Sequence, residues 1–70
     1  MTMYIVIELQ KNAAGNVSNI VTDKPTLAEA ESAYYSILAA AAVSSVPVHS
    51  AIIVSEEGFP VKHQCYKHGV

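Results

Sequence analysis

The first part of the chain carries an apolar, β-branched segment at residues 3–10, which predicts a β-strand. Because successive side chains of a strand point to opposite faces, its positions divide into two rows. One row is entirely apolar and is expected to meet a helix: Met3, Ile5, Ile7 and Leu9. The other row mixes apolar and polar groups, and we expect a neighbouring subunit to cover part of it: Tyr4, Val6, Glu8 and Gln10. A turn at residues 11–16, in which Gly15 can take a positive φ, and a weaker strand at residues 17–22 complete a predicted β-hairpin.

A capping box formed by Thr26 and Glu29 predicts the start of a helix. The helix is expected to run from Leu27 to about Val43, because Pro47 disfavours helical backbone at the residue before it. Apolar residues at three- and four-residue spacings predict a stripe that faces the core: Leu27, Ala30, Tyr34, Ile37 and Ala41. A second apolar stripe lies beside it: Tyr35, Leu38 and Ala42. The apolar arc is therefore wide, which favours two contact surfaces on this helix rather than one.

Two further strands are predicted after the helix. Residues 48–55 are mostly apolar and β-branched, and residues 59–66 follow them after a short turn. Pro60 has no backbone N–H to donate, so the start of the last strand is expected at a sheet edge or a bulge. We predict a single α+β domain over residues 1–70: a β-hairpin, a helix and a second β-hairpin (ββαββ). In this architecture one helix packs on a four-stranded antiparallel sheet.

The stretch from Ser32 to Ser55 contains no Asp, Glu, Lys or Arg. Charged residues make up 14% of the chain, whereas ordinary domains contain about 25%. A chain of 70 residues has marginal stability alone, and its single cysteine, Cys65, excludes an internal disulfide. We therefore expect a homo-oligomer that forms through one side of the Ala-rich helix: Tyr35, Leu38, Ala39, Ala42 and Val43.

Charge and hydropathy argue against nucleic acid and membrane as partners. The formal net charge is −2 and there is no arginine, whereas nucleic-acid binding depends on clustered basic residues. The apolar tract at residues 33–54 is rich in Ala and Ser and contains Pro47 and His49, unlike the roughly 20 strongly apolar residues of a membrane span. No basic residue precedes the apolar run that begins at Met3, so we expect no signal peptide and a cytoplasmic location.

Candidate catalytic and metal-binding groups are few. His63, Cys65 and His68 are metal-ligating types at close spacing, but a structural zinc site needs four ligands and no fourth is evident. Cys65 would serve as a nucleophile with His63 or His49 as base, although a free cysteine on an apolar strand face is more often inert. The glycines are isolated and form no phosphate-binding loop. We predict a non-enzymatic protein without a metal or another cofactor.

The remaining polar and aromatic side chains suit a small ligand. Aromatic rings stack on flat ring systems, and Lys and protonated His bind phosphates. Pockets for such ligands often form where subunits meet. The predicted ligand-binding residues are Tyr4, Tyr34, Tyr35, His49, Lys62, His63, Gln64, Tyr66, Lys67 and His68. The alternative is that Tyr34 is a core residue, Tyr35 lies at the oligomer contact and the C-terminal Lys and His residues are ordinary surface charge.

Several segments, which together contain 30 of the 70 residues, resemble a family of small uncharacterised proteins encoded by bacteriophages and prophages of Gram-positive bacteria. These are Met3–Gln10, Glu29–Ser32, Leu38–Ala51 and Cys65–His68. The resemblance implies a phage accessory protein in the cytoplasm of the host cell. By analogy with other small oligomeric phage proteins, we expect an anti-defence factor that sequesters a nucleotide-derived immune signal in pockets between subunits. The alternative is a phage structural or interaction module that binds a host or virion protein.

Overall fold

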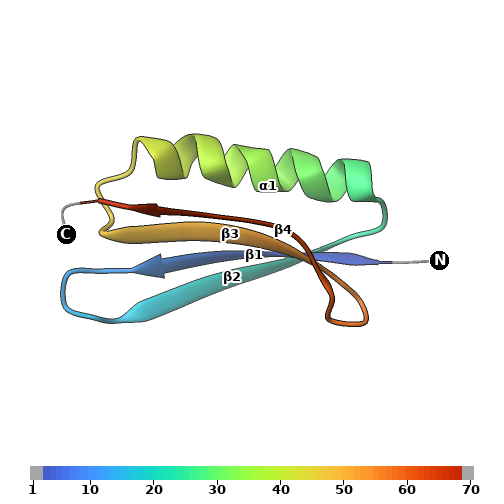
Figure 1. The fold of residues 1–70 in the computed structure, drawn as a ribbon, viewed down its shortest axis with the longest axis horizontal. Helices are drawn as coiled ribbons and strands as arrows, with labels where there is room; N and C mark the ends of the chain where they lie inside the picture. The colour runs from blue at the N-terminus through green and yellow to red at the C-terminus, as the bar shows by residue number, and fades with distance from the viewer. Residues whose placement is uncertain (1–2, 69–70) are drawn as a thin grey trace.

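Two β-hairpins flank a single helix along the chain, in the order ββαββ (Figure 1). The computed structural model describes residues 3–68. Its elements are β1 (Tyr4–Lys11), β2 (Val17–Lys24), α1 (Leu27–Ala42), β3 (Val48–Ser55) and β4 (Pro60–Lys67). The predicted α+β class and architecture are confirmed. Strand β2 continues past Thr22 to Lys24, because Asp23 and Lys24 pair with Ile5 and Tyr4 of β1.

The four strands form one antiparallel sheet in the order β2-β1-β3-β4. Strands β1 and β3 pair along their full length, from Tyr4 opposite Ser55 to Lys11 opposite Val48. The hairpin strands β2 and β4 therefore form the two edges. Pro60 lies in edge strand β4 beside a register shift at Ile53 and Val54, as its missing donor predicts.

The start of α1 contains the predicted capping residues in a modified arrangement. The Thr26 hydroxyl accepts a hydrogen bond from the Glu29 backbone N–H at 3.2 Å. The Glu29 carboxylate accepts from the Thr26 hydroxyl at 3.4 Å, rather than from the Thr26 backbone as the sequence predicts. Gly15 and Gly58 both have a φ of 90°, which lets the two hairpin turns close.

The helix covers the opposite face of β1 from the one predicted. Val6 is 1% exposed and lies opposite the fully buried Ile53, so the covered row is Tyr4, Val6, Glu8 and Gln10. The more apolar row with Ile5, Ile7 and Leu9 faces away from the helix and is half-buried. The prediction that this row meets the helix is wrong, because the mixed row pairs with Ala51 and Ile53 of β3, and together these rows form the core beneath α1.

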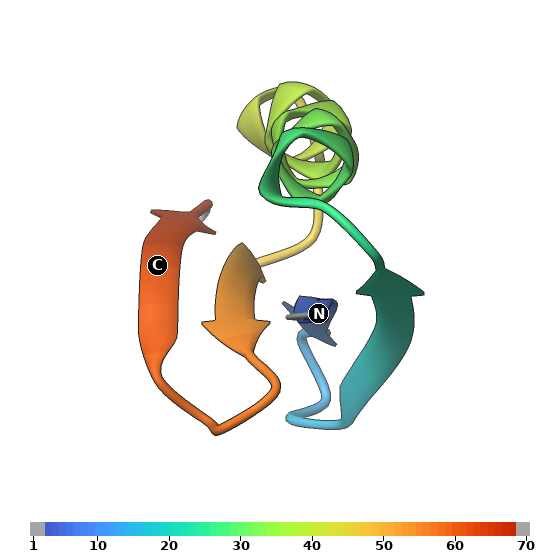
Figure 2. The same cartoon turned by 90° about the vertical axis from the view of Figure 1, so that its right-hand side faces the viewer.

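The core lies between α1 and the two central strands. It consists of Val6, Ala30, Tyr34, Ala51 and Ile53, with Tyr4, Ala33, Ile37 and Leu38 packed around it. The predicted helix stripe is confirmed at Ala30, Tyr34 and Ala41, whereas Leu27 at the helix start is 36% exposed. Figure 2 shows α1 on one side of the sheet and, among the described residues, no helix or strand on the other. Within residues 3–68, no helix has the length and apolar character needed to cross a membrane.

Candidate functional site

The register of the sheet separates the predicted ligand-binding residues onto two faces. The side that α1 covers carries Tyr4, His49, Lys62, Gln64 and Tyr66. His63 and Lys67 alternate with these along β4 and lie on the other face, opposite Ile52 and Val48. The sheet therefore does not bring all ten predicted residues into one site.

A tyrosine–lysine cluster lies between α1 and β4 and contains Glu31, Tyr34, Tyr35 and Lys62. The Lys62 ammonium is 5.7 Å from the centre of the Tyr35 ring and 3.5 Å from a Glu31 carboxylate oxygen. The rings of Tyr34 and Tyr35 meet edge to face, with centres 5.1 Å apart. Hydrogen bonding to Tyr35 is the main cause that raises the pKa of Lys62, so the lysine carries its charge at neutral pH. The cluster presents a cation beside a half-exposed aromatic ring.

Tyr34 takes part in this cluster from the core side. It is 4% exposed, and burial raises the pKa of its phenol above the ordinary value, with the neighbouring Tyr35 as a second cause. The alternative assignment of Tyr34 to the core thus agrees with its position. Tyr35 is 52% exposed and is the member of the pair that is open to a ligand or a partner.

The end of β4 is tied to the end of α1 by His68. Its Nε2 donates to the carbonyl oxygen of Ala41 at 2.8 Å, and its backbone N–H donates to the Pro47 carbonyl at 2.7 Å. The His68 and Tyr66 rings stack with their centres 6.2 Å apart. These bonds give His68 a structural role that its predicted ligand role did not include.

A buried histidine–glutamate pair lies under the helix. His49 Nε2 and a Glu8 carboxylate oxygen are 2.6 Å apart, with side chains 5% and 18% exposed. Gln10 donates a further hydrogen bond to the same Glu8 oxygen at 3.1 Å, whereas the buried His49 Nδ1 has no partner. The sequence analysis did not identify Glu8. Its signal is that Glu8 is the one acidic residue of β1 and His49 the one histidine in the uncharged tract.

The face of the sheet opposite α1, which we call the outer sheet face, is largely apolar. The register places these side chains on it: Ile5, Ile7, Leu9, Val17, Val21, Val48, Ile52 and Val54. Val17 and Val21 on the edge strand are 63% and 56% exposed. Strand β2 therefore exposes apolar side chains on the face that the helix does not cover.

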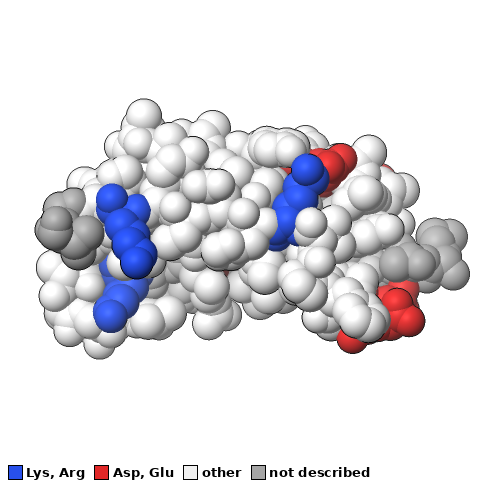
Figure 3. Space-filling view, viewed as in Figure 1, with Lys and Arg blue, Asp and Glu red and all other residues white. Residues whose placement is uncertain are grey.

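The two ends of the outer sheet face carry opposite charge. At the end with the β1–β2 turn, Lys11 and Lys67 lie on either side of Val48. At the other end, Asp23 lies beside Ile5, and the β3–β4 turn carries Glu56 and Glu57. Figure 3 shows basic side chains near one end of the molecule and acidic side chains at the other, with a further basic side chain beside acidic ones between them.

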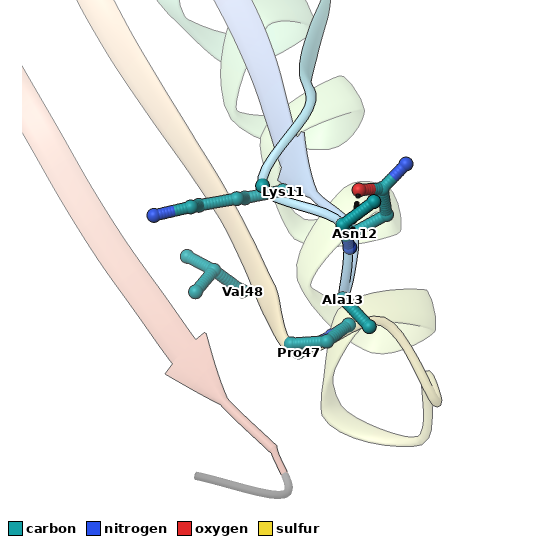
Figure 4. Close-up of a pocket in the computed structure, with 7 residues that line it drawn as sticks. Lys11, Asn12, Ala13, Pro47 and Val48 are labelled. Carbon is teal, nitrogen blue, oxygen red and sulfur yellow. Dashed lines mark hydrogen bonds between the residues drawn. The ribbon is translucent and has the colours of Figure 1, made fainter.

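A pocket of about 420 Å³ lies at the basic end. Its lining residues are Lys11, Asn12, Ala13, Ala14, Gly15, Pro47 and Val48. Lys11 and Val48 point the same way from neighbouring strands (Figure 4). The Asn12 side chain is engaged in the turn, where its oxygen accepts from the backbone N–H groups of Ala14 and Asn16, each at 3.0 Å. None of the predicted ligand-binding residues lines this pocket.

The candidate metal ligands and catalytic groups do not form one site. His63 and Cys65 lie on the outer sheet face, whereas His68 bonds to the end of α1. Across residues 3–68, no three His, Cys, Asp or Glu side chains gather in a position to hold a metal ion. His49 lies on the opposite face from Cys65, so these two residues do not form a nucleophile–base pair.

Comparisons with protein-family models, curated proteins and solved structures found no match to this chain. Its function is therefore inferred from the surfaces described above.

Proposed function

We propose that the protein is a non-enzymatic binding module that acts as a homo-oligomer and assembles through the outer sheet face. The observation that supports this most strongly is the group of Ile, Leu and Val side chains on that face, which α1 does not cover. Large exposed apolar patches on small domains mark interaction sites. A 70-residue chain also gains stability when a partner covers part of its surface.

This proposal moves the assembly surface from the helix to the sheet. Leu38, which the sequence assigns to the helix contact, packs against the core instead. The outward helix positions Ala39 and Ala42 offer only methyl groups, and Val43 lies just beyond the last turn. The outer sheet face offers several isoleucine and valine side chains, so it would bury more apolar area.

Light scattering on two matched lysine variants tests the choice of surface. Ile7→Lys places a charge in the centre of the outer sheet face, and Ala39→Lys places the same charge on the exposed side of α1. We expect Ile7→Lys to lose the oligomer and Ala39→Lys to keep the wild-type mass. The reverse result would restore the helix as the contact, and a monomeric wild-type protein at micromolar concentration would contradict assembly altogether.

The tyrosine–lysine cluster favours a second candidate function, which is sequestration of a small nucleotide-derived ligand. Tyr35 offers an exposed ring for stacking, and the Lys62 ammonium beside it suits a phosphate. Together with the resemblance to phage-encoded proteins, this supports an anti-defence accessory factor in the host cytoplasm. The alternative within the same resemblance is an interaction module for a host or virion protein.

A thermal-shift panel of cyclic and linear nucleotides tests the ligand hypothesis. We expect stabilisation by one class of nucleotide, its loss in Tyr35→Ala and Lys62→Ala, and recovery of intact ligand after denaturation. A degraded ligand would indicate an enzyme. Absence of any shift, with a macromolecule that co-purifies with the protein, would favour the interaction module.

A further inference from the structure

We propose that the outer sheet face is covered by a second copy of this chain in an antiparallel, two-fold arrangement. In this arrangement the basic end of one copy covers the acidic end of its partner. The inference rests on the proposed assembly through the outer sheet face and adds the partner and its orientation.

The size of the face is adequate for a dimer. It spans four strands of eight residues each. With strands about 4.8 Å apart and a rise of about 3.4 Å per residue, its flat projection is about 500 Å². Two copies would thus bury about 1,000 Å² together, which is near the lower limit for a specific interface. Apolar rows from two sheets packed about 10 Å apart form the core of an ordinary β-sandwich.

Two-fold symmetry leaves two aligned ways to stack the sheets. If the axis runs along the strands, each end of the face meets the same end of the partner, and Lys11 and Lys67 of both copies are brought together. If the axis runs across the strands, each strand lies over its own copy in the opposite direction. The basic end then meets the acidic end twice.

The charge positions favour the second arrangement strand by strand. Lys11 ends β1, and in the antiparallel dimer it lies over the start of the partner's β1, where Asp23 is the neighbour on β2. Lys67 ends β4 and lies over the partner's β3–β4 turn, which carries Glu56 and Glu57. Opposite charges at an interface rim fix orientation, whereas like charges oppose it.

Distance measurement between spin labels tests the orientation. The label is attached at Ala14→Cys, on the exposed tip of the β1–β2 turn, in a Cys65→Ser background. The antiparallel dimer places the two labels at opposite ends, at a separation close to the 40 Å length of the chain. The parallel dimer places them within about 20 Å, since stacked sheets lie about 10 Å apart. A short distance in a protein that Ile7→Lys still dissociates would overturn the orientation and leave the assembly surface intact.

Two matched double charge reversals also test the orientation of the dimer, through their effects on the dimer dissociation constant. Lys11→Glu with Lys67→Glu makes both ends acidic, and we expect the dimer dissociation constant to rise at least tenfold at low salt. Lys24→Glu with Lys62→Glu changes the net charge equally on the helix-facing side and should leave the constant within about twofold. The antiparallel dimer would be contradicted if both double variants weakened dimer affinity equally, or if Lys11→Glu with Lys67→Glu did not weaken it. Absence of coupling between labels in the labelled Ala14→Cys, Cys65→Ser protein, together with a monomeric mass of the wild-type protein, would overturn both the dimer and the proposed function.

Discussion

The two faces of the sheet differ in polarity, and on β1 the helix covers the more polar face rather than the more apolar one. The helix covers the row with Val6, Glu8 and Gln10, which is the more polar face of β1. The row with Ile5, Ile7 and Leu9 is more apolar, and no helix or strand within residues 3–68 covers it. The polar residues are accommodated under the helix because Glu8 binds His49 and Gln10. Apolarity alone therefore does not indicate whether a strand face meets its own helix or another chain.

The largest expected difference between the faces comes from two neighbouring residues of β3. Ile53 is fully buried against α1, and Ile52 lies half-buried on the outer sheet face. Ile53→Ala should cost about 3 kcal/mol of unfolding free energy at any protein concentration. Ile52→Ala should cost less, and its cost should shrink on dilution because it acts mainly through the dimer. Urea unfolding at several protein concentrations measures both, and equal, concentration-independent losses would remove the distinction between the faces.

The next largest change in the free energy of unfolding is expected from the buried Glu8–His49 pair on the helix-facing side. His49→Leu leaves the Glu8 carboxylate with Gln10 alone in a mostly buried position, and we expect a loss of about 3 kcal/mol. The double variant Glu8→Leu with His49→Leu removes both polar groups and should recover most of that loss. Chemical denaturation of the two single variants and the double variant gives the coupling energy. A double variant as unstable as the sum of the single ones would show that the pair does not stabilise the core.

The elements of the fold followed from local patterns, whereas the assignment of faces did not. Alternation in β1, the Thr26–Glu29 cap and Pro60 were sufficient for the strands, the helix and the edge position. Both rows of β1 are apolar enough to form a core, so the choice between them depended on the partner row in β3, which local sequence does not reveal.

The candidate site was predictable only in part, for a similar reason. Tyr35 and Lys62 are distant in sequence. They meet only because β4, which pairs with β3, lies beside α1. The sequence marked both as ligand residues through their chemistry, but it missed Glu31, which holds Lys62, and Lys11, which lines the pocket. Which of these groups meet depends on strand order, which local sequence patterns do not specify.

A smaller loss of stability is expected from changes to the N-terminal cap of α1. Thr26→Ala removes the hydroxyl that accepts from the Glu29 N–H and should lower stability by about 1 kcal/mol. Thr26→Ser keeps the acceptor and is the control. If Thr26→Ala and Thr26→Ser lowered the melting temperature equally, the Thr26 hydroxyl would not stabilise the start of α1.

The smallest expected effect is a pH dependence on the same side. Burial raises the pKa of Tyr34 in the folded state, so its contribution to stability is complete below the ordinary phenol value near 10 and is lost as pH rises through the folded value. Urea midpoints should therefore fall as the pH rises above about 10. Tyr34→Phe should remove that fall, whereas Tyr35→Phe should reduce it only in part, because burial of Tyr34 is a larger cause of its raised pKa than the neighbouring Tyr35.

The most direct test of the outer sheet face compares the accessibility of the Ile52 and Ile53 side-chain methyl groups to a soluble paramagnetic agent by NMR. In the wild-type protein, a second copy would protect Ile52 as fully as α1 protects Ile53. In the Ile7→Lys variant, Ile52 should become accessible while Ile53 stays protected. An Ile52 methyl that is equally accessible in both proteins would contradict the claim that another copy of this chain covers the outer sheet face.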